Sequence, residues 1–183
     1  MKKWIAGGLA VLAVIVGLYA VSPYWAARQF LMAAQEGDAD ELDERVDFPA
    51  VRDSLKSQLN AQFMAKLQND PEMRENPFAA LGVMLVPAMV DQVVSGYVTP
   101  NGIAAIVKHG NANVGAVDKG SAGPPPDVSY EYASLNRFNV ILSPAGTPNE
   151  PLVLVFERQG LFGWQVIRLD IPEGVFETTP VAE

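Results

Sequence analysis

The stretch GLYAVSPYWAARQF, Gly17 to Phe30, joins an apolar N-terminus to the rest of a 183-residue chain and decides how the protein is organised. Upstream of the junction, Ile5 to Val21 is an uncharged apolar run of 17 residues. A helix rises 1.5 Å per residue, so this run spans about 26 Å, slightly less than a ~30 Å hydrocarbon core. Extended to Trp25 it reaches about 32 Å, with Trp4 at one interface and Tyr24 and Trp25 at the other. The pattern predicts one transmembrane helix.

A cleavable signal peptide is the alternative interpretation of the same stretch. Cleavage needs small residues in an A-x-A-like pattern, but Leu18-Tyr19-Ala20 is poor at its first position, and Ala20-Val21-Ser22 would place Pro23 directly after the cut. We therefore expect residues 1–21 to remain as a membrane anchor. Lys2 and Lys3 predict a cytoplasmic N-terminus and a domain on the other side of the membrane.

The downstream domain is acidic and contains no cysteine. Without the two anchor lysines, 11 basic residues face 21 acidic ones, a net charge near −10. Such an acidic domain is a poor binder of nucleic acids. It is also repelled by anionic lipid headgroups, so any membrane attachment must be hydrophobic. The absence of cysteine excludes disulfides, thiolate zinc sites and a cysteine nucleophile. We expect no cofactor and no metal.

The pattern of residues 22–110 predicts the helical part of a single domain. Ser22 and Pro23 resemble the N-cap and first residue of a helix that ends at Gly37. The stretch from Asp38 to Glu41 is shaped like a capping box and opens a second helix. Asp47 can cap a third helix, whose apolar residues recur almost every four positions: Val51, Leu55, Leu59, Phe63 and Leu67.

The next segment, Phe78 to Val90, is apolar on all sides. A run of 13 residues is too short to span a membrane and is more typical of a buried core helix. The alternative is an exposed face, carrying Met84 and Met89, that docks on lipid or on a partner protein. A short helix from Asn101 to Lys108 follows Thr99 and Pro100.

Residues 111–126 form a predicted loop, and residues 127–172 read as four strands. Alternating apolar residues occur in VSYEYAS, RFNVILS, LVLVFER and WQVIRLDI, which are separated by short connections. Short connections predict antiparallel neighbours. PAGTPNEP is the longer hairpin turn, and residues 173–183 are a tail. The predicted fold class is α+β: N-terminal helices packed on a four-stranded antiparallel sheet, preceded by one transmembrane helix.

Few residues suggest chemistry. The weak catalytic candidates are Asp47, Asp91 and His109, the single histidine, which lies beside Lys108 at a helix C-terminus where positive charge is favourable anyway. Acidic residues 38–47 lack calcium-loop spacing. Candidate ligand-binding residues are Arg52, as a partner for a ligand carboxylate or for the neighbouring Asp47, and three tyrosines: Tyr97, Tyr130 and Tyr132.

Several motifs together carry a family resemblance. They are SPYWA after the anchor, AAQEGDADEL, VDFPAVR, TPNGI at residues 99–103, and LVLVFERQGLFGWQVIRL near the end. The chain resembles a domain-of-unknown-function family of Gram-negative bacterial proteins with an N-terminal membrane segment. The resemblance implies an inner-membrane anchor and a periplasm-facing domain, and it implies no activity and no site residues. A looser similarity is to the NTF2-like and cystatin-like cones.

Three functional hypotheses follow. The first is a non-catalytic periplasmic module that binds an apolar ligand or a cell-envelope protein. The second is an NTF2-like enzyme with Asp47, Asp91 or His109 as acid or base in a cavity, although the chain has no early strand between its helices and lacks the Asp/His/Tyr set of such enzymes. The third is a purely structural or assembly role.

Overall fold

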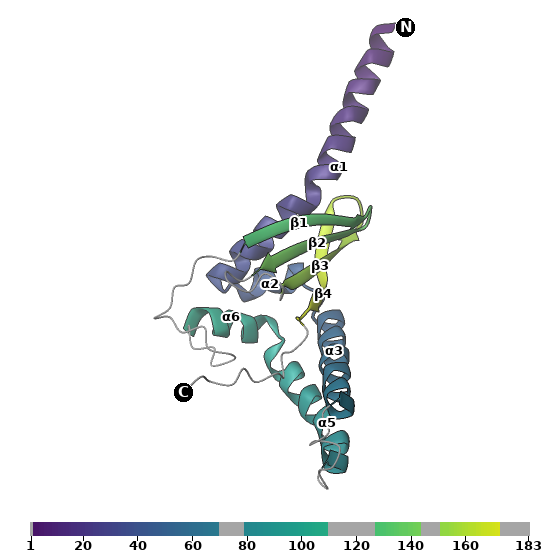
Figure 1. Cartoon of the computed structure of the whole chain (residues 1–183). Helices are drawn as coiled ribbons and strands as arrows, with labels where there is room; N and C mark the ends of the chain where they lie inside the picture. Colours follow the sequence, from purple (N-terminus) through teal and green to yellow (C-terminus); the bar gives the residue numbers. More distant parts are fainter. Residues whose placement is uncertain (1, 70–78, 110–126, 144–150, 173–183) are drawn as a thin grey trace.

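The computed structural model describes residues 2–69, 79–109, 127–143 and 151–172. The sequence folds into helices followed by strands, as the pattern predicts (Figure 1). The elements are α1 (Lys2–Glu36), α2 (Ala39–Arg45), α3 (Phe48–Asn69), α5 (Ala79–Tyr97), α6 (Pro100–His109), β1 (Asp127–Ser134), β2 (Arg137–Ser143), β3 (Leu152–Gln159) and β4 (Gly163–Asp170). The expected loop at 111–126, the turn within 144–150 and the tail from residue 173 lie outside the described residues.

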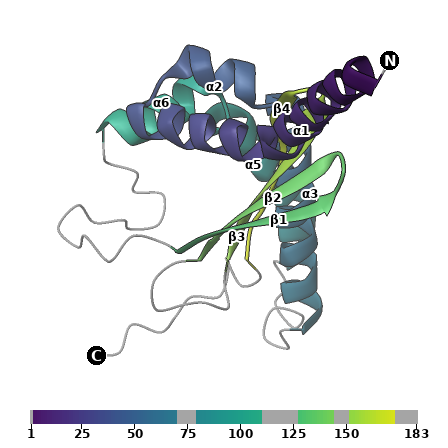
Figure 2. The same ribbon diagram turned by 90° about the horizontal axis from the view of Figure 1, so that it is seen from above.

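The four strands form an antiparallel sheet in the order β1-β2-β3-β4. In β2, β3 and β4, alternate side chains point to one face and are buried there, as a period of two requires. Figure 2 shows α1, α2 and α6 gathered on one side of this sheet. The fold class is therefore α+β, as predicted. The sheet contributes six buried side chains to the core: Phe138, Val140, Leu154, Phe156, Trp164 and Val166.

Helix α3 runs along the outer edge of β4. Asp47, just before α3, donates its backbone N–H to the Val166 carbonyl at 2.9 Å. Farther along, the Gln58 side chain donates to the Leu169 carbonyl at 2.8 Å and accepts from the Ile171 N–H at 3.1 Å. These bonds satisfy main-chain groups that an edge strand otherwise leaves open for pairing with another chain.

The helix ends lie where the capping residues predict. Asp38 accepts hydrogen bonds from the Asp40 and Glu41 N–H groups at the start of α2. Asp47 accepts one from Ala50 at 3.0 Å, and the Thr99 hydroxyl accepts one from Gly102 at 3.0 Å. Each carboxylate or hydroxyl satisfies an N–H group that the first turn of a helix leaves unpaired.

One predicted helix start is wrong. Ser22 and Pro23 do not open a new helix, because α1 is continuous from Lys2 to Glu36 with Pro23 buried inside it. A single helix thus leads from the apolar N-terminus into the core of the domain, where Ala27 and Ala33 are buried. Figure 1 shows its N-terminal part standing clear of the sheet.

The expectation that Phe78 to Val90 forms a buried core helix is also wrong in the part that the structure describes. Helix α5 packs on α3 along one side, where Gly82 faces the Phe63 ring and Val94 is buried. Its other side is open to solvent. Exposed apolar side chains there are Met84, Leu85, Met89, Val93 and Tyr97.

Candidate functional sites: the helix–sheet junction and the exposed face of α5

The first candidate site is the junction between α1 and the sheet, centred on Pro23. Proline has no N–H, so it leaves the carbonyl four residues earlier, at Tyr19, without its helical donor. The Ser22 hydroxyl donates to this Tyr19 carbonyl at 2.9 Å. The neighbouring Ala20 carbonyl accepts a hydrogen bond from the Tyr132 hydroxyl of β1 at 2.6 Å. Carbonyls of the proline-containing turn are therefore satisfied by side chains, which explains why the helix continues.

Arg158 links this turn of α1 to both tight hairpin turns of the sheet. Its guanidinium donates to the Leu135 carbonyl at 3.2 Å and to the Leu161 carbonyl at 2.8 Å. The guanidinium carbon also lies 3.6 Å from the Tyr19 ring centroid and 4.2 Å from that of Trp164. Two aromatic faces and two turn carbonyls thus hold one cation, an arrangement that fixes the turns against the helix.

An aromatic cluster lies beside Arg158. The Phe138 ring is buried, with ring centroids of Tyr24 at 4.8 Å, Tyr132 at 5.0 Å and Tyr130 at 6.0 Å. Such tilted and stacked pairs add about 0.5–1.5 kcal/mol each beyond burial. Burial raises the pKa of the Tyr132 hydroxyl above 10.0, against the opposing positive charge of Arg158. The hydroxyl therefore stays protonated and keeps donating to Ala20.

Two open grooves border the junction. One has a volume of about 400 Å³ and a mixed lining that includes Gln29, Glu44, Arg45 and Trp164. The other, of about 310 Å³, is mainly apolar and is lined by Leu18, Val21, Ser22, Trp25 and Phe162. The apolar groove thus joins the predicted membrane segment to the turn between β3 and β4. An open apolar groove of this kind suits a hydrocarbon chain better than a polar substrate.

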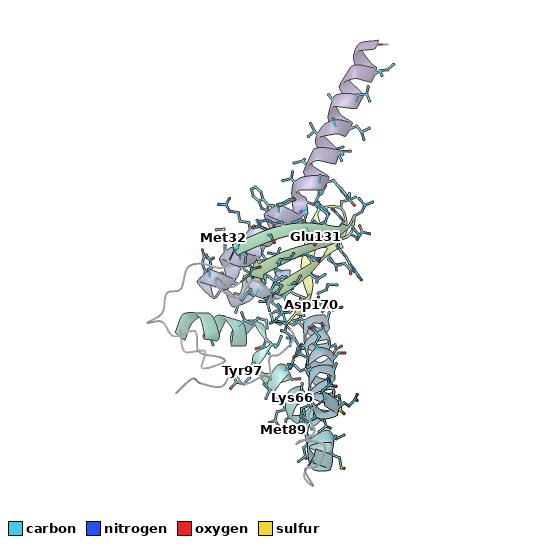
Figure 3. All side chains as sticks on the ribbon, viewed as in Figure 1. Met32, Lys66, Met89, Tyr97, Glu131 and Asp170 are labelled. Carbon is cyan, nitrogen blue, oxygen red and sulfur yellow. The ribbon has the colours of Figure 1, made fainter. Side chains whose placement is uncertain are left out.

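The second candidate site is the exposed face of α5, defined by Met84, Leu85, Met89, Val93 and Tyr97. Their side chains are 55–76% exposed. Four of the five recur every four residues, at 85, 89, 93 and 97, so they follow one stripe along the helix. Figure 3 shows the labelled Met89 and Tyr97 at the end of the molecule opposite the start of α1. A contiguous apolar stripe on a domain surface is typical of a docking site.

The predicted catalytic residues do not come together in the described structure. Asp47 caps α3, and Asp91 is an exposed residue of α5 whose carboxylate lies 2.6 Å from the Lys56 amine of α3. His109 is the last residue of α6, and its side chain lies outside the described ones. Within the described ranges, no three acidic or histidine residues are grouped closely enough to hold a metal ion.

The predicted ligand-binding residues are likewise dispersed. Arg52 donates from Nε to the Phe48 carbonyl of its own helix at 3.1 Å, and the described residues show no ion pair between it and Asp47. Tyr97 lies on the exposed face of α5, whereas Tyr130 and Tyr132 belong to the aromatic cluster on β1. The structure thus assigns these four residues to three different places.

The motifs behind the family resemblance have structural roles. In GDADEL, Gly37 has a positive φ of 64°, Asp38 caps α2 and Leu42 is fully buried. In TPNGI, a Cβ on Gly102 would lie 2.3 Å from the Tyr97 carbonyl oxygen. This distance is too short for any side chain, so only glycine fits there. The motifs therefore define helix ends and close backbone contacts.

Sequence reasoning missed Arg158 and the role of Ser22. A signal for Arg158 was present, because it follows Leu152, Leu154 and Phe156 at the same period of two and therefore falls on the core-facing side of β3. A charged side chain at such a position needs partners. No comparable local signal exists for Ser22, whose hydroxyl also accepts from the Trp164 indole at 2.9 Å, 142 residues away.

These features define an α+β domain that continues directly from a helix long and apolar enough to cross a membrane. The chain belongs to the family described as "Protein of unknown function (DUF2939)", which matches residues 12–106, just over half of its length. The match runs from within α1 to within α6 and leaves the sheet outside. Comparisons with curated proteins and with solved structures find no match.

Proposed function

We propose that this protein is a non-catalytic interaction module, anchored in the bacterial inner membrane by α1, whose domain lies in the periplasm and binds an envelope protein through the exposed face of α5. The observation that carries this proposal is the apolar stripe of α5, with Met84, Met89 and Tyr97 open to solvent. A contiguous apolar patch on a domain surface is typical of a site that a partner covers.

Retention of the anchor is supported by the continuity of α1. Signal cleavage near Ala20 or Ser22 would cut a helix whose residues on both sides contact the sheet. Upstream, Tyr19 contacts Arg158 and the Ala20 carbonyl accepts from Tyr132, and downstream, Tyr24 packs on Phe138. Intact mass of the protein purified from membranes is expected to include α1. A product beginning near Ser22 in the soluble fraction would contradict the anchor.

Orientation is testable because the chain has no native cysteine. In intact spheroplasts, a membrane-impermeant maleimide is expected to label full-length Asp53→Cys, which is exposed on α3 outside the proposed partner face, as strongly before lysis as after it. Labelling that appears only after lysis would mean a cytoplasmic domain and would contradict the positive-inside expectation.

The partner of α5 is proposed to be a protein with an apolar, neutral-to-basic surface. The bilayer that holds α1 is a poor candidate, since the α3–α5 pair points away from the N-terminal end of α1 (Figure 1). A second copy is disfavoured because two domains of net charge near −10 repel each other.

The test places a photoreactive side chain at Met89 in cells, with a control at Asp53, which is exposed on α3. A discrete adduct is expected from position 89 alone, and Val93→Asp in the same chain should abolish it. The adduct is identified by mass spectrometry, and the purified partner is titrated against full-length protein. Burial of one such side chain contributes about 1.5–3 kcal/mol, so Met89→Asp should weaken binding at least about tenfold, whereas Asp53→Asn should not.

Three outcomes would overturn the proposal. Equal adducts from positions 53 and 89 would remove specificity, and a self-adduct at 89 would identify homodimerisation instead. A purified partner whose affinity ignores Met89→Asp would show that α5 is not the binding face.

A further inference from the structure

The end of the sheet that carries both tight hairpin turns has a surface of its own. Leu135, in the turn between β1 and β2, is 75% exposed, and Leu161 and Phe162, in the turn between β3 and β4, are 71% and 48% exposed. Since the sheet is antiparallel in sequential order, both turns lie at the same end. Arg158 binds carbonyls of both turns and so holds them together. Trp25 of α1, 68% exposed, borders the same end through the apolar groove.

The apolar groove shows which part of α1 the turn between β3 and β4 lies beside. Phe162 lines it together with Leu18, Val21 and Trp25. Leu18 and Val21 lie at the C-terminal end of the apolar run. The run rises about 26 Å, so all of it is needed to cross a ~30 Å hydrocarbon core, and its C-terminal end lies at the surface of that core. Phe162 must therefore lie at the level where the hydrocarbon core meets the headgroups.

No linker separates the anchor from the sheet. The helix is continuous through Pro23, and its carbonyls at Tyr19 and Ala20 are held by Ser22 and Tyr132. The sheet is hence attached rigidly at this level, and the turns cannot lift away from the membrane without breaking the Tyr132–Ala20 and Trp164–Ser22 hydrogen bonds.

The chemistry of this end matches the membrane interface. Trp25 is an aromatic residue of the type that concentrates at headgroup level. Arg158 lies at the same level, with its charge contacting the Tyr19 and Trp164 rings and the turn carbonyls. The acidic domain gains nothing from anionic lipids, so apolar side chains must provide the contact.

We propose that Leu135, Leu161 and Phe162 insert into the periplasmic interface of the bilayer and contact lipid acyl chains, so that the domain stands on the membrane at a fixed tilt with α5 facing away from it. This inference rests on the proposed anchor, and the membrane supplies the apolar environment that the three exposed side chains lack in the isolated chain.

The test uses single-cysteine variants of the full-length, otherwise cysteine-free chain in phosphatidylcholine vesicles, each carrying a nitroxide spin label. Phe162→Cys and Leu161→Cys report on the turn, Val14→Cys reports on the anchor, and Met89→Cys reports on the exposed face of α5. Collision rates with lipid-soluble oxygen and with a water-soluble nickel complex are measured at each position. Since Leu161 is largely exposed, its replacement leaves the fold intact even if Phe162→Cys does not.

Labels at 161 and 162 are expected to give collision rates between those at 14 and 89, with severalfold more oxygen collisions and severalfold fewer nickel collisions than at 89. Added anionic lipid should leave this ratio unchanged. Labels at 161 and 162 that behave like position 89, while position 14 remains in lipid, would overturn the inference and leave the anchor standing. Aqueous behaviour at position 14 would overturn the anchor and the inference together. Lipid exposure at position 89 would also refute it, since the domain would then lie flat on the bilayer.

Discussion

Replacing Arg158 by alanine tests whether one side chain holds the hairpin turns against α1. The change removes hydrogen bonds to the Leu135 and Leu161 carbonyls and contacts with the Tyr19 and Trp164 rings. Hydrogen bonds contribute about 0.5–1.5 kcal/mol each and cation–π contacts at partly exposed sites about 0.5–1 kcal/mol each. Their sum predicts a loss of about 3 kcal/mol in the free energy of unfolding.

The assay is urea unfolding of the full-length protein in non-ionic detergent, followed by circular dichroism, because the substitution would alter Trp164 fluorescence directly. With an m-value of about 2 kcal/mol/M, the midpoint should fall by about 1.5 M. Arg158→Lys should recover less than half of the loss, since one ammonium group cannot bind both carbonyls as the planar guanidinium does.

Arg168→Ala is the matched control. Arg168 lies on β4, its side chain is 54% exposed, and its carboxylate partner, Asp170, is on the same strand. Exposed ion pairs contribute about 0.2–1 kcal/mol, so this midpoint should shift by no more than about 0.5 M. If Arg158→Ala and Arg168→Ala shift the midpoint equally, the assignment of Arg158 as the link between turns and helix is refuted.

Three further substitutions test other parts of the structure. Leu42→Ala empties a fully buried position between α2 and the core and should cost about 2–5 kcal/mol in chemical denaturation. Gly102→Ala brings a Cβ within 2.3 Å of the Tyr97 carbonyl oxygen and should cost about 1–3 kcal/mol by the same measurement. Tyr132→Phe removes the hydrogen bond to the Ala20 carbonyl and should lower stability by about 1 kcal/mol at pH 7. Because the folded pKa of Tyr132 is raised, its contribution is complete below pH 10.0 and is lost as the pH rises through the folded pKa, so wild type and Tyr132→Phe should converge there.

Each of these three predictions can be contradicted by a specific result. Gly96→Ala, on α5 with open space around its Cβ position, should stabilise by about 0.5–1 kcal/mol; equal effects at positions 96 and 102 would refute the close contact. A Leu42→Ala cost below that of an average surface change would place Leu42 outside the core. A wild-type protein whose stability advantage over Tyr132→Phe persists well above pH 10 would show that the hydroxyl proton is not needed.

Local chemistry accounts for what was predicted correctly. The caps at Asp38, Asp47 and Thr99 depend on side chains that bond to N–H groups two or three residues away, so a few letters of sequence specify them. The strands follow from a period of two, which also sets their core-facing side. Arg158 could have been identified in the same way. It lies two residues after Phe156 on β3, and residues two apart on a strand share a face.

The sequence by itself determined the order of elements, the helix starts capped by Asp38, Asp47 and Thr99, the strand faces and an apolar N-terminal segment long enough to cross a membrane. Tertiary structure alone decided that α1 continues through Pro23 and that one side of α5 stays open. The physical reason is distance along the chain: the Tyr132 hydroxyl that binds the Ala20 carbonyl is 112 residues away, and the exposure of α5 depends on which of its sides α3 covers. Propensity and periodicity describe neighbours within a few residues, whereas these features depend on which distant surfaces meet.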